Sequence, residues 1–292
     1  DANCLSTNLY ADTDDDDDGV PDSSDPFPLI SVAGFPDEDN NGYPDVCNAQ
    51  CIATGMTAEP GGPWMLIDDF IDGPAMSDKF GEAVSISFDG SVVAIASFYH
   101  DGQGTALQDA GQVQVWKWDG TSWNTRGQFM NGQTNGENLG WSVALNANGN
   151  RLAVGVPHYN NNEGRTEIYD WTNNANDYSL SYSHSGSAGS HSGETLAISA
   201  DGGRLAIGEP YAAETRGKVI VLNLTNITNP TQVGTSINGD TNGGQLSASA
   251  LSLKNNGQTL AIGDPLFDGA NTPDNGHVRV FDLQNTDGTE NW

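Results

Sequence analysis

The sequence predicts an all-β protein in which four similar units follow a short acidic segment. Three observations predict this organisation. A strand–turn–strand pattern recurs four times, and a further alternating apolar segment follows each copy without helical periodicity. Residues 1–51 carry 13 Asp and Glu residues but no Lys or Arg. The length of 292 residues suits one large all-β domain or two ordinary domains.

Composition excludes several classes of protein. Hydrophobic residues make up 36% of the chain, which is enough to bury a core. The formal net charge of -29 repels nucleic-acid phosphates and anionic lipid, so we expect neither as a partner. No apolar run approaches the roughly 18 residues of a membrane helix, so no membrane insertion is expected. The chain starts at Asp1 without a signal peptide, which suggests a processed or truncated part of a larger precursor.

Two N-terminal segments have the spacing of calcium-binding loops. Such loops place oxygen ligands at positions 1, 3, 5, 7 and 9, with glycine at the sharply turned position 6. Gly19 and Gly42 occupy position 6, and Pro-Asp follows at the same offset in both segments. The alternative is a solvated acidic linker, which would not repeat these offsets. The expected Ca²⁺ ligands are Asp14, Asp16, Asp18, Val20, Asp22 and Asp25 in the first loop, and Asp37, Asp39, Asn41, Tyr43 and Asp45 in the second.

Over residues 12–48 these motifs resemble thrombospondin type 3 repeats. The resemblance implies that bound Ca²⁺ substitutes for a hydrophobic core, so that folding of this segment depends on calcium. The segment departs from that family in having few cysteines, and the family's disulfide ladder is therefore not assumed.

All three cysteines, Cys4, Cys47 and Cys51, lie in the same N-terminal segment. This concentration in a small, core-poor region is typical of an oxidising compartment. Three cysteines allow one disulfide and leave one thiol. Pairing of Cys4 with Cys47 or with Cys51 would close the segment end to end, and both pairings stay open.

The domain boundary is predicted at residues 57–63, a turn-rich linker between the calcium segment (1–56) and the repeats (64–292). The turn glycines of the repeats are separated by 59, 53 and 55 residues. Each hairpin turns at Asn-Gly or Asp-Gly. A third and a fourth strand follow each hairpin, and the fourth strand is clearest at residues 123–132. The four hairpins are Val84–Ala96, Val143–Gly155, Leu196–Gly208 and Leu251–Gly263.

Four strands per repeat of this length predict the four-stranded blades of a β-propeller. A β-sandwich is the alternative, but it requires no such period. Residues 64–73 match residues 123–132, so they are expected to form an outer strand. That strand could complete the last blade and close a ring, or be donated to a neighbouring subunit. A larger ring with further blades is equally consistent with the sequence.

The repeats also resemble FG-GAP-type blades over residues 64–292. The likeness rests on Phe80-Gly81 and Leu139-Gly140 before the first strand and on Gly-x-Pro at 155–157, 208–210 and 263–265 after the second. In that family some hairpin turns bind calcium through alternating acids. The turns here lack those acids, so no calcium is assigned to the propeller.

Residues typical of catalysis are sparse, and we expect no enzymatic activity. The five histidines form no metal-spaced pair and are expected to be polar surface residues, His184 and His191 in a Ser/Gly-rich loop. Glu209 and Asp264 precede Pro at the same repeat position, which is more typical of a turn than of a catalytic pair. Asn223 and Asn226 begin two consecutive N-glycosylation sequons, as expected of a secreted glycoprotein.

The expected function is that of an extracellular, calcium-stabilised structural or adhesive protein. It would form part of a fibre or cell-surface appendage through packing of its propeller. Its expected partners are further copies of itself, other extracellular proteins or glycans. The alternative is a lectin or carbohydrate-active enzyme that uses the loop face of the propeller, for which Trp116, Trp118, Trp123 and Trp171 could supply sugar-stacking surfaces.

Overall fold

A computed structural model describes residues 70–73, 76–102, 107–240, 245–247, 250–268, 275–286 and 289–291. The chain separates into two units, Asp1–Asp69 and Phe70–Trp292. The candidate calcium ligands, the three cysteines and the linker at 57–63 lie outside the described residues.

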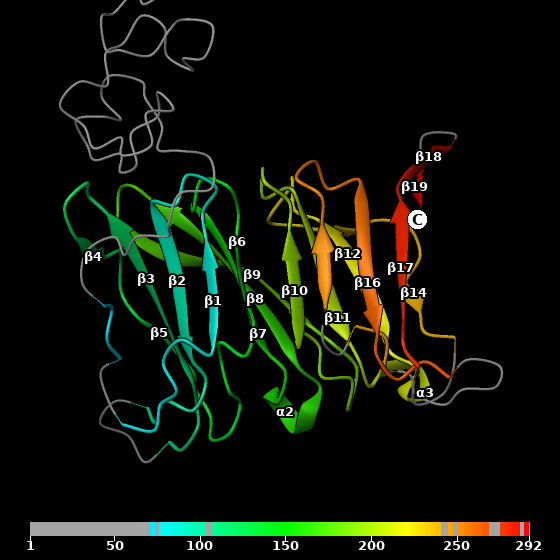
Figure 1. Ribbon diagram of the computed structural model, residues 1–292, viewed down its shortest axis with the longest axis horizontal. Helices are drawn as coiled ribbons and strands as arrows, with labels where there is room; N and C mark the ends of the chain where they lie inside the picture. The colour runs from blue at the N-terminus through cyan, green and yellow to red at the C-terminus, as the bar shows by residue number, and fades with distance from the viewer. Residues whose placement is uncertain are drawn as a thin grey trace, which may run out of the picture. The chain divides into compact units, whose positions relative to one another are not determined.

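The second unit is a β-propeller arrangement of four blades, as the repeats predict. Figure 1 shows the blades following one another in chain order, from the cyan and green first blade to the orange and red fourth. The first blade contains β1 (Ala83–Ile86), β2 (Val92–Ser97), β3 (Gln112–Trp118), β4 (Trp123–Thr125) and β5 (Met130–Asn131). The second contains β6 (Val143–Leu145), β7 (Arg151–Val156), β8 (Arg165–Thr172) and β9 (Asp177–Ser185).

The third blade contains β10 (Thr195–Ile198), β11 (Arg204–Glu209), β12 (Lys218–Asn223), β13 (Thr231–Gln232) and β14 (Ile237–Asn238). The fourth contains β15 (Leu251–Leu253), β16 (Thr259–Asp264) and β17 (His277–Asp282). The main strands of each blade form an antiparallel meander, and in blades 1 and 3 the short strands β5 and β14 also pair with the third strands, β3 and β12. A separate hairpin joins β18 (Gln284–Thr286) to β19 (Thr289–Asn291).

The hairpin turns follow the local sequence. Gly90, Gly149, Gly202 and Gly257 all have φ between 65° and 72°, the left-handed region that glycine enters at little cost. Successive side chains point to opposite faces of a blade, and in β2, β7 and β11 nearly every residue on both faces is buried. Each interior blade therefore presents one apolar face to the preceding blade and another to the following one.

The hydrophobic core lies between blades rather than within one layer. Blades 1 and 2 pack through a cluster that includes Val113, Val115 and Leu152. Blades 2 and 3 pack through Ile168 and Leu205, among others. A third cluster joins blades 3 and 4 and contains Val219, Val221, Leu246, Leu260 and Ile262. The face-to-face burial explains why both faces of these strands are apolar.

The outer strands differ from the prediction. The segment 123–132, expected as one strand, forms two short strands, β4 and β5, which pair with opposite ends of β3. Gly127, with φ of 80°, interrupts the strand between them. Residues 70–73 are not in a strand, and the fourth blade has three strands among the described residues. The remainder of the expected outer strand, residues 64–69, lies outside the described part.

Two short helical turns mark the loops between the second and third strands of blades 2 and 3. They are α2 (Tyr159–Asn162) and α3 (Ala212–Thr215), at the same end of the sheets in Figure 1. We call this end the loop face. Among the described residues, no helix has the length and apolar character needed to cross a lipid bilayer.

Candidate functional site

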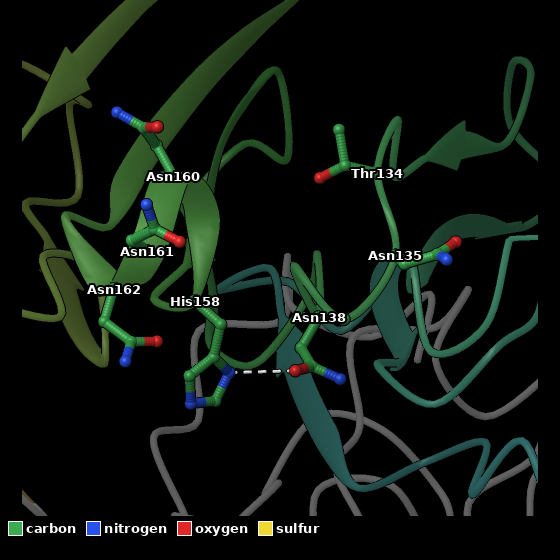
Figure 2. A pocket seen from close by; sticks show the side chains of 8 residues that line it. Thr134, Asn135, Asn138, His158, Asn160, Asn161 and Asn162 are labelled. Atoms are coloured by element: carbon green, nitrogen blue, oxygen red, sulfur yellow. Dashed lines mark hydrogen bonds between the residues drawn. The ribbon is translucent and has the colours of Figure 1, made fainter.

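A polar cleft of about 600 Å³ lies on the loop face between blades 1 and 2. Figure 2 shows its two walls, one from the segment after β5 and the other from the segment after β7, which includes α2. All of its lining side chains are uncharged, although the chain carries 39 acidic residues. The lining residues are Thr134, Asn135, Gly136, Asn138, His158, Asn160, Asn161 and Asn162.

Asn138 and His158 join the two walls. The Asn138 Nδ2 donates to the carbonyl oxygens of Phe98, at 2.9 Å, and Asp109, at 3.2 Å. These bonds fix the amide orientation, so Asn138 Oδ1 is the acceptor for His158 Nδ1–H at 2.8 Å. Burial lowers the pKa of His158, which favours the neutral ring with a lone pair on Nε2.

Buried charged side chains stabilise the walls of the cleft. Glu137 is fully buried and accepts hydrogen bonds from Gln133 N and from Thr134 Oγ1, which shapes the first wall. Arg165 lies 2.8 Å from Glu167 and 4.0 Å from Glu137, and its guanidinium stacks over the Tyr159 ring. This network connects a loop of blade 1 to a strand of blade 2 and fixes the spacing of the walls.

The second wall has an uncommon backbone. Asn160, Asn161 and Asn162 have φ of 48°, 56° and 64°, so three consecutive residues are left-handed. Asparagine tolerates this region better than most residues, which explains the Asn run. The equivalent turn of blade 3 has the same backbone at Ala213, Glu214 and Thr215, so the conformation belongs to the repeat and the asparagines are particular to blade 2.

Aromatic and imidazole rings run from this cleft along the loop face. The ring of Trp141 lies 5.1 Å from His158, and His158 lies 5.2 Å from His191. His191 in turn lies 4.5 Å from the ring of Tyr211. This row of rings extends from blade 2 to blade 3, so its contacts stabilise the loops next to the cleft.

The first strands of all four blades converge on a central groove of about 520 Å³. Its lining includes Glu82 of blade 1, Trp141 of blade 2, Glu194 of blade 3 and Leu251 of blade 4. Burial raises the pKa of Glu194 to about 7. His191 Nδ1 lies 3.4 Å from the Glu194 carboxyl.

A second cleft, of about 480 Å³, lies where the outer strands of blades 1 and 2 meet and includes Arg126 and Trp171. Arg126 lies 4.3 Å over the Trp171 ring, so that face of the indole is occupied by the protein itself. Trp118 and Trp123 pack against each other across β3 and β4 at 5.6 Å. These three tryptophans therefore contribute to packing within and between blades.

The structure places the sequence candidates as follows. Asn223 ends β12, and Asn226 is exposed in the loop after it. Glu209 and Asp264 occupy the same position in different blades, and each faces a basic side chain on the neighbouring strand. Glu209 pairs with Lys218 at 2.7 Å, and Asp264 lies 3.6 Å from His277.

The expectation of a polar surface residue is wrong for His100, which is buried and lies 2.7 Å from Asp78. The expected loop position is wrong for His184, which belongs to β9. The predicted sites did not include the cleft. Its signals were the run of three asparagines at 160–162 and the Asn-rich segment at 134–138, which the repeat alignment treats as loops.

No family model and no curated protein matches this chain, so the thrombospondin type 3 and FG-GAP resemblances stay unconfirmed. Among solved structures it is similar to a periplasmic gluconolactonase of Pseudomonas aeruginosa, at 15% identity and a TM-score of 0.46 over 72% of this chain. It is also similar to TolB of Acinetobacter baumannii, at 11% identity and a TM-score of 0.41 over 68%. The chain spans 55% and 40% of these two proteins.

The expectation that the chain is not an enzyme is corrected by this comparison. One of the similar structures is an enzyme by its name, so a propeller without a recognisable catalytic motif does not exclude catalysis. The sequence argument was wrong because it relied on local motifs. In a propeller, reacting groups come together from separate blades and need no common spacing in the sequence.

Proposed function

We propose that this chain is an extracellular structural and adhesive protein whose loop face binds neutral glycans. The observation that carries the adhesive part is the cleft lined only by neutral hydrogen-bonding groups. Asn side chains offer a donor and an acceptor side by side, which matches neighbouring sugar hydroxyls. A few fixed polar groups in a preformed cleft are the usual basis of ligand orientation. A lectin-type role is thus included in the proposal.

The adhesive role is tested at α2. Asn161→Gly with Asn162→Gly removes two amides while keeping the left-handed backbone that glycine adopts readily. We expect wild-type protein to bind neutral oligosaccharides in calorimetry and the double variant to bind them at least about tenfold more weakly, which is roughly 1.4 kcal/mol.

The matched control is the equivalent left-handed turn of blade 3, α3, with Glu214→Gly and Thr215→Gly. This control should bind as the wild type does. Equal loss in both double variants, or wild-type protein that binds no neutral oligosaccharide, would contradict the adhesive role.

The structural role is proposed to depend on Ca²⁺ bound at the two N-terminal loops. Oxygen ligands at these spacings form sites that are loaded at extracellular calcium levels. Chelation by EGTA is expected to expand residues 1–51 and raise the hydrodynamic radius of the full chain, while β-sheet circular dichroism persists. Asp16→Asn with Asp39→Asn should reproduce this expansion in the presence of calcium. An unchanged radius under chelation would show that these loops are not calcium sites.

A further inference from the structure

The fourth blade exposes an apolar surface that the other blades bury. The third strands of blades 1, 2 and 3 carry Val113 and Val115, Thr166 and Ile168, and Val219 and Val221 at matching positions, all at most 2% exposed. The matching residues of the fourth blade are Val278 and Val280, which are 70% and 67% exposed. We call this pair the trailing face.

The first blade exposes the complementary surface. Val84, Ile86 and Phe88 are 62%, 59% and 84% exposed. At the matching positions, Val143 and Leu145 of blade 2 pack in the cluster between blades 1 and 2. We call the three exposed residues the leading face. The exposure of both faces shows that, in the described part of the chain, blade 4 does not cover blade 1.

The surroundings of the turn glycines also differ between the first blade and the others. A Cβ added to Gly149 would lie 2.7 Å from Val92 of the preceding blade, and one added to Gly257 would lie 2.6 Å from Arg204. A Cβ on Gly90 would meet no described atom within 4 Å. The first hairpin thus carries the same turn glycine as the others, but no described residue packs against it.

Backbone hydrogen bonds repeat across the three junctions. Phe88 N–H donates to the Ala147 carbonyl, Ala147 N–H to that of Ala200, and Ala200 N–H to that of Asn255, each at 2.9 Å. In every case the earlier blade donates and the later blade accepts. A fourth junction of the same kind would place Asn255 N–H of blade 4 against a carbonyl equivalent to that of Phe88.

We propose that the leading face of a second copy of this chain packs on the trailing face of the first. Val84 and Ile86 of one copy would cover Val278 and Val280 of the other. The partner is a second copy because each chain carries one face of each kind, built from the repeat positions that already pair inside it. The proposal rests on the proposed structural role and specifies the contact.

The contact is heterologous, since two different surfaces meet. Repetition of such a contact gives a closed ring or an open filament. The net charge of -29 opposes the approach of two copies, and salt screens that repulsion while leaving apolar burial intact. Association should therefore strengthen as sodium chloride is raised.

Sedimentation velocity of the full chain with calcium, over a range of concentrations, tests the contact. Val280→Asp and Ile86→Asp should each weaken self-association at least about tenfold, since each places a charge in the apolar contact. Leu180→Asp is the matched control, because Leu180 is also exposed but lies on β9, away from both faces. It should associate as the wild type does.

A mixture of Val280→Asp and Ile86→Asp tests whether the leading face of one copy contacts the trailing face of another. Val280→Asp keeps an intact leading face, and Ile86→Asp keeps an intact trailing face. An equimolar mixture should form one-to-one dimers and nothing larger, whereas either variant alone stays monomeric. No recovery on mixing, or wild-type protein that is monomeric at every concentration and salt level, would overturn the proposal.

Hydrogen exchange of the wild-type chain covers the case in which a variant does not fold. Amides of β1 and β17 should gain protection as concentration rises, while those of β9 should not. Equal change in all three strands would contradict a contact at these faces. Glycan binding by Val280→Asp and Ile86→Asp distinguishes the self-association proposal from the glycan-binding proposal. Both variants should bind glycans as the wild type does, because neither substituted residue lines the cleft between blades 1 and 2.

Discussion

Replacing Ile168 with Ala is expected to lower the free energy of unfolding by about 2–5 kcal/mol. Ile168 lies in β8, is fully buried and packs against Leu205 and its neighbours between blades 2 and 3. Its removal leaves a cavity that close-packed strands from two blades can fill only in part. Urea denaturation followed by circular dichroism measures the change.

Val280 occupies the same repeat position in blade 4, and it serves as the control. Val280→Ala should change stability by no more than about 0.5 kcal/mol in dilute, monomeric protein. The contrast between two equivalent positions isolates the effect of a covering blade. Equal losses at both positions would show that blade 4 is covered in solution even in the monomer. A loss below about 1 kcal/mol at Ile168 would mean that the junction between blades 2 and 3 is loosely packed.

Replacing Lys218 with Met is expected to cost about 3 kcal/mol at neutral pH. Lys218 Nζ lies 2.7 Å from the carboxylate of Glu209, whose side chain is almost fully buried. Burial by itself raises the pKa of Glu209, but His184 and Lys218 together hold it below its ordinary value. Without Lys218 the carboxylate is left buried with a weaker partner.

The contribution of Glu209 to the free energy of unfolding is expected to decrease as pH falls. In the wild type, the depressed pKa of Glu209 gives stability that is present above the ordinary glutamate pKa. This stability is lost as pH falls through the folded-state pKa. In Lys218→Met the pKa of Glu209 should rise, so the stability difference between the two proteins should shrink on acidification.

Two further variants complete the test of the buried pair. Adding Glu209→Gln to Lys218→Met should recover much of the loss, because no buried charge is then left. Glu214→Gln, at an exposed ion pair with Arg216, should have an effect of at most about 1 kcal/mol. A pH-independent loss in Lys218→Met would indicate lost packing rather than an uncompensated charge.

Much of the fold follows from local signals. The Asn-Gly and Asp-Gly turns and the alternation around them predict each hairpin, and β1 with β2 falls within the expected segment 84–96 to within one residue. The third strands are also placed correctly, since β12 overlaps the expected Gly217–Leu222. The outer strand of blade 1 was less predictable, because its pairing depends on β3 more than on its own residues.

The candidate site could be predicted only in part. Thr134 to Asn138 and His158 to Asn162 are separated in sequence by two strands and meet only when blade 2 packs on blade 1. The ion pair of Glu209 with Lys218 likewise depends on the pairing of β11 with β12. Neither juxtaposition has a motif of fixed spacing, so the sequence alone indicates polar residues without their arrangement.

The sequence by itself determined the four repeats, the hairpin turns and the all-β class, because turn chemistry and the two-residue period of strands are local properties. Only the tertiary structure decided which copy of a repeat position is buried. Val221 and Val280 have the same side chain and the same place in their strands, yet one is covered and the other exposed. Burial depends on whether a neighbouring blade covers the strand, and that is a property of the assembled blades rather than of the strand.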